Sequence, residues 1–248
     1  MRAALLAIGL ALVQAAAAAE EARLAIAANF AAPAGALAEQ FSRDTGHRLA
    51  ISAGSTGKLY AQIRNGAPFD VLLAADEETP RRMERERLAV PGSRFTYALG
   101  KLVLWSPKKD LVDDKGEVLQ KAAFKRLAIA NPKLAPYGAA AVETMKRLGV
   151  WPLLQGRLVQ GENIAQAFQF VASGSADLGF VALSQIAERG KGSAGSHWLV
   201  PPSLHAPIRQ DAVLLLHGAR NAAAREFLAY LRSARARESI RGYGYGLQ

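Results

Sequence analysis

Residues 49–65 read LAISAGSTGKLYAQIRN and contain the unit from which the fold is built. Leu49 to Ser52 is a short apolar run typical of a β-strand, and Lys58 to Asn65 repeats apolar residues at helical spacing. The small and polar residues Gly54 to Gly57 join the two segments. This stretch therefore predicts a strand, a tight junction and a helix, in that order.

The same alternation of short apolar strands and amphipathic helices continues on both sides of this stretch. The predicted strands are 23–28, 49–52, 70–75, 102–105, 126–130, 177–183 and 211–216. The predicted helices are 33–45, 58–65, 77–87, 139–148, 164–172 and 222–231. The strand at 70–75 is apolar on both faces, as a buried parallel strand would be. Strands that alternate with helices imply an α/β fold with mainly parallel sheets.

The composition is that of a globular protein with one or two domains. The chain has 248 residues, of which 50% are hydrophobic and 21% are charged. It has no cysteine, which excludes disulfides, cysteine zinc sites, iron–sulfur centres, a thiol nucleophile and a lipid-anchored N-terminal Cys. The 31 Lys and Arg residues exceed the 21 Asp and Glu residues, and the formal net charge of +10 favours anionic partners.

Residues 1–19 have the pattern of a secretory signal peptide. Arg2 precedes an apolar run over residues 3–13, and Ala15 to Ala19 supply the small residues of a cleavage site before Glu20. An uncleaved membrane anchor is the alternative, but the run is shorter than the roughly 20 residues that span a bilayer. We therefore expect a cleaved leader and an exported, soluble protein.

Small or polar residues stand at four places where an extended segment gives way to a helix. These junctions are Ala28-Asn29, Gly54 to Gly57, Pro136-Tyr137-Gly138 and Asn163-Ile164. A plain helix cap explains any one of them. Four together, in a fold that gathers strand ends around one crevice, indicate an anion pocket, because helix N-termini carry free N–H groups. Each helix start carries roughly +0.5 of an elementary charge, so the four junctions together supply about +2 elementary charges without any Lys or Arg.

Other patterns do not meet the requirements of their motifs. Residues 54–58 resemble a phosphate loop, but Ser52 stands where its first glycine belongs and Leu59 follows the lysine. Ser55 is not in a nucleophile elbow, because residue 53 is Ala. The four histidines lack metal-ligand spacing. The arginines over 225–241 are more typical of a solvated helix face than of a nucleic-acid site.

At the four junctions the sequence resembles the periplasmic molybdate-binding proteins of ABC transporters. The matching stretches run through nearly the whole chain after the leader, in the family's order. They are AANF (27–30), SAGSTGKLYAQI (52–63), NGAPFD (65–70), AAD (74–76), PGSRFTY (91–97), PYG (136–138) and ADLGFVA (176–182). Each piece alone is unspecific, whereas their combination is specific to this family.

The resemblance implies a type II periplasmic binding protein fold, in which two α/β lobes enclose a ligand cleft. Lobe 1 would comprise residues 20–100 and 206–248, and lobe 2 residues 101–205. It further implies a monomer in the periplasm that captures molybdate, and also tungstate, for a membrane permease driven by an ATPase. The oxyanion would be cargo, and no cofactor, catalysis or nucleic acid is expected.

The resemblance also assigns the site residues. Asn29 and Ser55 match positions whose side chains contact the oxyanion at the starts of two helices of the first lobe. Ile164 matches a hydrophobic position that binds through its backbone N–H. Tyr137 matches a tyrosine that donates its hydroxyl in one branch of the family. None of these residues would coordinate the metal atom directly.

Two positions depart from the family pattern. The better-known branch has its tyrosine where this chain has Ala182, so Tyr137 and residue 182 look like alternative sources of one phenol. Ala28 stands where some relatives have a hydroxyl, which implies one donor fewer.

Three alternatives stay open at this point. The same fold could bind another tetrahedral oxyanion such as sulfate or phosphate. Ser55 could serve an exported hydrolase, although the sequence shows no evident His or Asp partner for it. An adhesion or scaffold protein would bind no small anion at all.

Overall fold

The structure is a computed structural model that describes residues 19–187 and 195–248. The predicted signal peptide, except for Ala19, lies outside the described residues. Within these two ranges, no helix has the length and apolarity required to cross a membrane.

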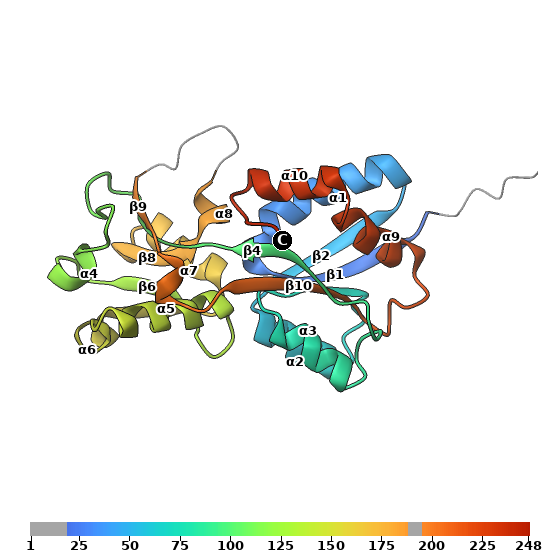
Figure 1. The fold of residues 1–248 in the computed structure, drawn as a ribbon, viewed down its shortest axis with the longest axis horizontal. Helices are drawn as coiled ribbons and strands as arrows, with labels where there is room; N and C mark the ends of the chain where they lie inside the picture. Colours follow the sequence, from blue (N-terminus) through green and yellow to red (C-terminus); the bar gives the residue numbers. More distant parts are fainter. Residues whose placement is uncertain (1–18, 188–194) are drawn as a thin grey trace, which may run out of the picture.

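Two α/β lobes lie side by side, each built on a five-stranded sheet (Figure 1). The first sheet has the order β2-β1-β3-β10-β4, and the second has the order β7-β6-β8-β5-β9. The first comprises β1 (Glu21–Ala27), β2 (Arg48–Gly54), β3 (Val71–Leu73), β4 (Phe95–Gly100) and β10 (Ile208–Leu214). The second comprises β5 (Leu102–Ser106), β6 (Leu127–Ala130), β7 (Leu158–Gly161), β8 (Leu178–Ala182) and β9 (Ser196–Leu199).

Helices flank both sheets. In the first lobe they are the 3₁₀ turn η1 (Ala28–Phe30), α1 (Ala31–Thr45), α2 (Thr56–Arg64), α3 (Glu78–Arg85), α9 (Ala222–Leu231) and α10 (Ala234–Gly242). In the second they are α4 (Val118–Lys121), α5 (Pro136–Arg147), α6 (Trp151–Leu154), η2 (Gln155–Arg157), α7 (Ile164–Ala172) and α8 (Leu183–Ile186). The turn η3 (Pro202–Leu204) precedes the return to the first lobe.

Each sheet contains one reversed strand. Strands β1, β2 and β3 pair in parallel, whereas β10 is antiparallel to both of its neighbours, β3 and β4. The second sheet repeats this arrangement with β5 as the reversed strand between β8 and β9. Both reversed strands directly follow a crossing between lobes, so the chain enters each sheet from the side of the other lobe. The α/β prediction is therefore confirmed, with sheets that are mixed rather than purely parallel.

Several boundaries differ from the sequence-based expectation for local reasons. Helix α5 begins at Pro136 rather than at residue 139, because proline is suited to the first helical turn. The sequence pattern does not predict the strands β4, β7 and β9, the one-turn helices α4, α6 and α8, or the helix α10. The α10 sequence ARARESIRG has a weak apolar pattern, with Ala236 and Ile240 as its buried apolar residues.

Two crossing segments connect the lobes (Figure 1). One leads from β4 to β5 through Lys101, and the other returns through residues 200–207 to β10. The strands of the first sheet thus come from both ends of the chain, and those of the second from its middle. The predicted lobe boundaries agree with this layout but stay a prediction.

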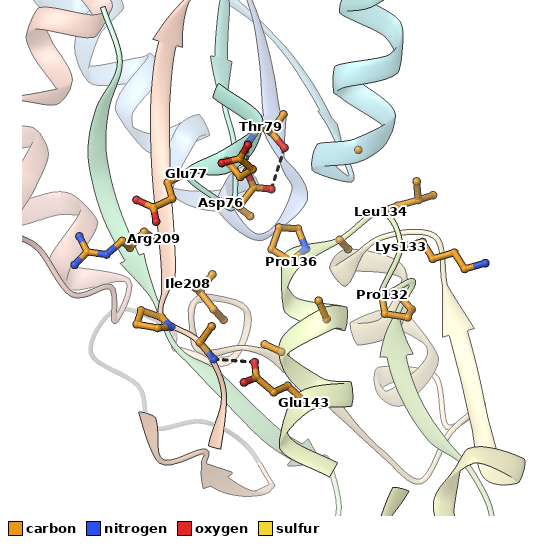
Figure 2. Close-up of a pocket in the computed structure, with 18 residues that line it drawn as sticks. Asp76, Glu77, Thr79, Pro132, Lys133, Leu134, Pro136, Glu143, Ile208 and Arg209 are labelled. Carbon is orange, nitrogen blue, oxygen red and sulfur yellow. Dashed lines mark hydrogen bonds between the residues drawn. The ribbon is translucent and has the colours of Figure 1, made fainter. Parts of the chain in front are cut away.

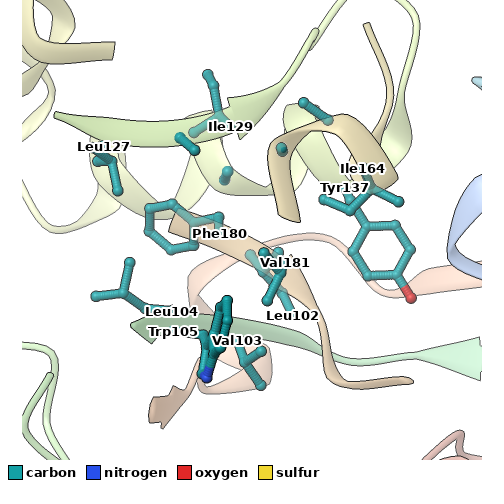
Figure 3. Packing of buried hydrophobic residues seen from close by; sticks show 14 of the residues in the cluster. Leu102, Val103, Leu104, Trp105, Leu127, Ile129, Tyr137, Ile164, Phe180 and Val181 are labelled. Carbon is teal, nitrogen blue, oxygen red and sulfur yellow. The ribbon is translucent and has the colours of Figure 1, made fainter. Parts of the chain in front are cut away.

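The core of the second lobe holds two of the predicted site residues at its edge. Leu104, Phe180 and Val181 pack between the sheet and its helices, and Tyr137 and Ile164 lie beside them (Figure 3). The side chain of Ile164 is 3% exposed. Burying such a side chain contributes roughly 1.5–3 kcal/mol, which fixes the start of α7 against the sheet.

Candidate functional site

All four predicted junctions line one small pocket between the lobes. Its volume of about 10 Å³ is small, close to the minimum that a single buried water requires. The lining residues are Ala27, Ala28, Asn29, Gly54, Ser55, Thr56, Ala75, Ala135, Pro136, Tyr137, Asn163 and Ile164. The structure therefore brings together Asn29, Ser55, Tyr137 and Ile164, as the sequence predicted.

Ser55 occupies the N-cap position of α2 without capping the helix. Its backbone is extended, with φ −73° and ψ 144°, and its side chain makes no cap hydrogen bond. The residue is 3% exposed. Among the described residues, its hydroxyl is the buried side-chain polar atom that has no hydrogen-bond partner. Such an unsatisfied group costs about 1–3 kcal/mol, and this hydroxyl keeps its full capacity to donate to another group.

The side-chain amide of Asn29, the group expected to contact the anion, is hydrogen-bonded within the chain. Its Nδ2 donates to Gln210 Oε1 at 2.9 Å and to the Tyr245 hydroxyl at 3.0 Å. An amide nitrogen carries two protons, and these two bonds use both. The residue lies in the first turn at η1, where backbone N–H groups have no preceding carbonyl in the helix. The backbone N–H of Asn29 is therefore the donor that remains for a ligand.

Tyr137 lies in the first turn of α5 and is 1% exposed. Its hydroxyl accepts a hydrogen bond from Gln210 Nε2 at 3.0 Å. Burial raises the pKa of the phenol well above its ordinary value, so the hydroxyl stays protonated. Its backbone N–H, like that of Asn29, lies at a helix start. Tyr137 thus lines the pocket and reaches Gln210 of the other lobe, and its hydroxyl, having accepted this bond, still has a proton to donate.

Ile164 is the first residue of α7, and Asn163 is its cap. The Asn163 side chain accepts a hydrogen bond from Gln166 N at 3.0 Å, which satisfies one N–H of the first turn. Asn163 therefore acts as an ordinary cap, unlike Ser55. Ile164 precedes the capped Gln166 by two residues and lines the pocket.

The pocket lining contains no charged side chain. Lys58, which directly follows the junction at Gly54 to Gly57, points outward, and its Nζ pairs with Glu162 Oε1 at 2.8 Å. The Lys58 side chain is half exposed. Positive potential in the pocket therefore comes from helix starts and backbone N–H groups, which can hold an anion without a cationic side chain.

The two departures from the family pattern lie in different surroundings. Ala28 lines the pocket and presents a methyl group there. Ala182 ends β8, does not line the pocket, and donates its N–H to Gln185 Oε1 at 2.9 Å. The tyrosine among the residues that line the pocket is Tyr137 of α5.

A larger cleft of about 440 Å³ opens beside the pocket (Figure 2). It shares Ala75, Ala135 and Pro136 with the pocket, but its walls also carry acidic side chains. These are Asp76, Glu77, Glu78 and Glu143, against the basic residues Lys133 and Arg209. The excess of carboxylates disfavours an anion in the cleft, and the small neutral pocket is the better anion site.

Direct contacts between the lobes close the pocket on two sides. Gly57 N donates to Leu134 O at 2.9 Å. A Cβ at Gly57 would lie 3.1 Å from Leu134 Cα, so the absence of a side chain permits this approach. On the other side, Ser184 Oγ donates to Asn29 O at 2.9 Å. The lobes therefore contact each other directly next to residues that line the pocket.

The hydrolase interpretation of Ser55 lacks support from the geometry. The lining residues include no His, Asp, Glu or Lys that could accept the hydroxyl proton. Ser55 is a hydrogen-bond donor in a neutral pocket rather than an activated nucleophile.

Sequence reasoning missed the residues that support the pocket from behind. Thr56 Oγ1 accepts from Ala75 N at 3.0 Å, and Gln210 and Tyr245 bond to Asn29. Gln210 and Asp211 interrupt the apolar strand β10, and this polar pair is the sequence feature that could have indicated a buried supporting residue. Tyr245 lies 216 residues from Asn29 and gave no local signal.

Comparisons with known proteins agree with this geometry. The family model described as bacterial extracellular solute-binding protein matches residues 22–246. A molybdate-binding protein ModA from Azotobacter vinelandii is 56% identical over 242 residues, covering 98% of this chain and 96% of the relative. One from Rhodobacter capsulatus is 51% identical over 229 residues, covering 92% and 89%. The structure of the periplasmic molybdate-binding protein of Azotobacter vinelandii superposes with a TM-score of 0.90 at 44% identity, covering 92% of this chain and 99% of that one.

These matches extend over both lobes and all four junctions, which confirms the type II binding fold. The family consists of solute-binding proteins and not of enzymes. The chain belongs to the bacterial extracellular solute-binding protein family, within its group of periplasmic molybdate-binding proteins.

Proposed function

We propose that this protein captures molybdate, and also tungstate, in the periplasm and delivers it to a membrane permease driven by an ATPase. The observation that carries this proposal is the unpartnered Ser55 hydroxyl in a closed pocket without charged side chains. The high identity to proteins named for molybdate binding supports the choice of anion. The oxyanion is cargo, and the proposal requires no cofactor.

The proposed contacts combine one hydroxyl with backbone donors. Ser55 donates through Oγ, and Asn29, Tyr137 and Ile164 donate through their N–H groups. Each charge-assisted hydrogen bond contributes roughly 1.5–3 kcal/mol. These residues bind the oxygens of the anion and do not coordinate the metal atom. The phenol of Tyr137, which the resemblance assigned to the anion, accepts a hydrogen bond from Gln210 Nε2, and its own O–H proton stays available as a further donor, so that assignment stays a prediction.

The residues that line the pocket also bear on whether sulfate or phosphate could bind in place of molybdate. A buried carboxylate is one way to favour a protonated phosphate, and none lines this pocket. Sulfate carries the same charge as molybdate but is smaller, so fixed donors spaced for molybdate would not all reach it.

The remaining parts of the proposal concern the protein as a whole. We infer that residues 1–19 are removed on export and that the mature chain acts as a monomer. Residues 20–100 with 206–248 and residues 101–205 would move as the two lobes about the crossing segments. Closure would remove the anion from water and strengthen its hydrogen bonds.

Isothermal titration calorimetry with molybdate, tungstate, sulfate and phosphate tests this function. We expect one site per chain for molybdate and tungstate, and Kd values for sulfate and phosphate that are higher by about tenfold or more, equivalent to about 1.4 kcal/mol. Sulfate or phosphate binding as tightly as molybdate would assign the fold to that anion. A chain that binds none of the four would favour the adhesion or scaffold alternative.

A further inference from the structure

Gln210 is bonded to one pocket residue from each lobe. Its Oε1 accepts from Asn29 Nδ2 at 2.9 Å and from the Tyr97 hydroxyl at 3.0 Å. Its Nε2 donates to the Tyr137 hydroxyl at 3.0 Å. Gln210 is completely buried. A primary amide both accepts and donates, so one side chain can accept from the amide of Asn29 and donate to the phenol oxygen of Tyr137 at once.

The backbone around Gln210 is shaped for this contact. Gln210 pairs with Ala98 of β4, and the register between the two strands shifts between Gln210 and Asp211. Such a bulge redirects side chains, and bulges are enriched next to functional sites. These two strands also carry the chain into and out of the second lobe, so Gln210 lies at the hinge.

Gly100 gives a second, independent indication. A Cβ at Gly100 would lie 2.2 Å from the Tyr137 hydroxyl and 2.6 Å from Gln210 Nε2. Gly100 is the last residue of β4, at the point where the chain crosses between lobes. The absence of a side chain there leaves room for the bond between the phenol and the amide.

We propose that Gln210 is a positioning residue for anion capture, which couples the pocket to the hinge. It holds the side chains of Asn29 and Tyr137, and thereby aims the backbone N–H groups of both residues at the anion. When the lobes separate, the bond to Tyr137 breaks and the donor of the second lobe moves away from that of the first. This proposal rests on the proposed function, because it assigns a role in binding the same anion.

Two variants break this contact in different ways. Gln210→Met keeps the length of the side chain and removes its hydrogen bonds, whereas Gly100→Ala removes no polar group and displaces the phenol sterically. We expect each to raise the Kd for molybdate by about tenfold or more, the size of effect seen when supporting contacts behind a binding site are lost. Gly100→Ala keeps the proposal testable should Gln210→Met fail to fold.

A double-mutant cycle separates positioning from a general loss of stability. If the phenol acts through Gln210, Gln210→Met combined with Tyr137→Phe raises Kd no further than the stronger single change. Gln169→Met and Gly35→Ala are the matched controls, since Gln169 is exposed on α7 and a Cβ at Gly35 meets no atom within 4 Å. Both controls should bind within twofold of the parent.

Calorimetry gives Kd, and small-angle X-ray scattering with and without molybdate reports closure. In the parent, molybdate should reduce the radius of gyration, and Gly100→Ala should reduce this compaction at equal saturation. Variants that bind within twofold of the parent, or strictly additive effects in the cycle, would overturn the positioning role while leaving the proposed function intact. A parent chain that binds none of the four anions would contradict the proposed function and the role of Gln210 with it.

Discussion

A thousandfold excess of molybdate over Kd is expected to raise the midpoint of thermal unfolding by about 8–16 °C. A ligand that binds only the folded state stabilises it by RT ln(1 + [L]/Kd), about 4 kcal/mol at this excess. For a chain of this size each kcal/mol moves the midpoint by about 2–4 °C. The shift should grow with the logarithm of the molybdate concentration, as measured by calorimetry or circular dichroism.

Sulfate at the same ionic strength is the control for this measurement. It reproduces the charge and the screening of the added salt, and it should change the midpoint little. Equal shifts with molybdate and sulfate would indicate a general salt effect or a sulfate site, and either outcome contradicts a pocket that prefers molybdate.

Replacing Ser55 by alanine should weaken molybdate binding by about ten- to a hundredfold, the equivalent of one charge-assisted hydrogen bond. The unliganded protein should lose no stability, because the Ser55 hydroxyl makes no hydrogen bond within the described chain. Loss of affinity without loss of stability is unusual for a buried residue. Calorimetric titration and urea unfolding measure the two quantities separately.

Ser233 provides a matched control for Ser55. It is also the N-cap of a helix, and its Oγ accepts from Ala236 N at 3.2 Å. Ser233→Ala should therefore cost about 1 kcal/mol of stability and leave Kd unchanged, the reverse of Ser55→Ala. Should Ser55→Ala destabilise the unliganded chain and bind molybdate as tightly as the parent, Ser55 would be a structural cap and not a ligand.

The positions of the pocket could be predicted from the sequence because they depend on local order along the chain. Each junction is a short segment in which an extended stretch ends and a helix begins, as at Gly54 to Gly57. In an α/β lobe the carboxyl ends of such strands meet at one edge of the sheet. The structure confirms this convergence, since all four junctions line one pocket. Local pattern thus located Asn29, Ser55, Tyr137 and Ile164.

The donor groups could not be predicted in the same way, because they depend on partners far along the chain. The amide of Asn29 is engaged by Gln210, 181 residues away, and by Tyr245, 216 residues away. No pattern near Asn29 in the sequence indicates that its side-chain amide is hydrogen-bonded to these two residues, which leaves its backbone N–H as a donor for a ligand. The reversed direction of β5 and β10 follows likewise from the crossings between lobes, which periodicity does not reveal.

The crystal structure of the molybdate complex tests the central claim most directly, namely that a neutral pocket of helix starts captures the dianion. The account predicts one anion with its oxygens about 2.7–3.2 Å from Ser55 Oγ and from the backbone nitrogens of Asn29, Tyr137 and Ile164. It also predicts that no Lys or Arg side chain is bonded to the anion. A lysine or arginine bonded to the oxyanion, or an anion seated in the acidic cleft instead, would contradict it.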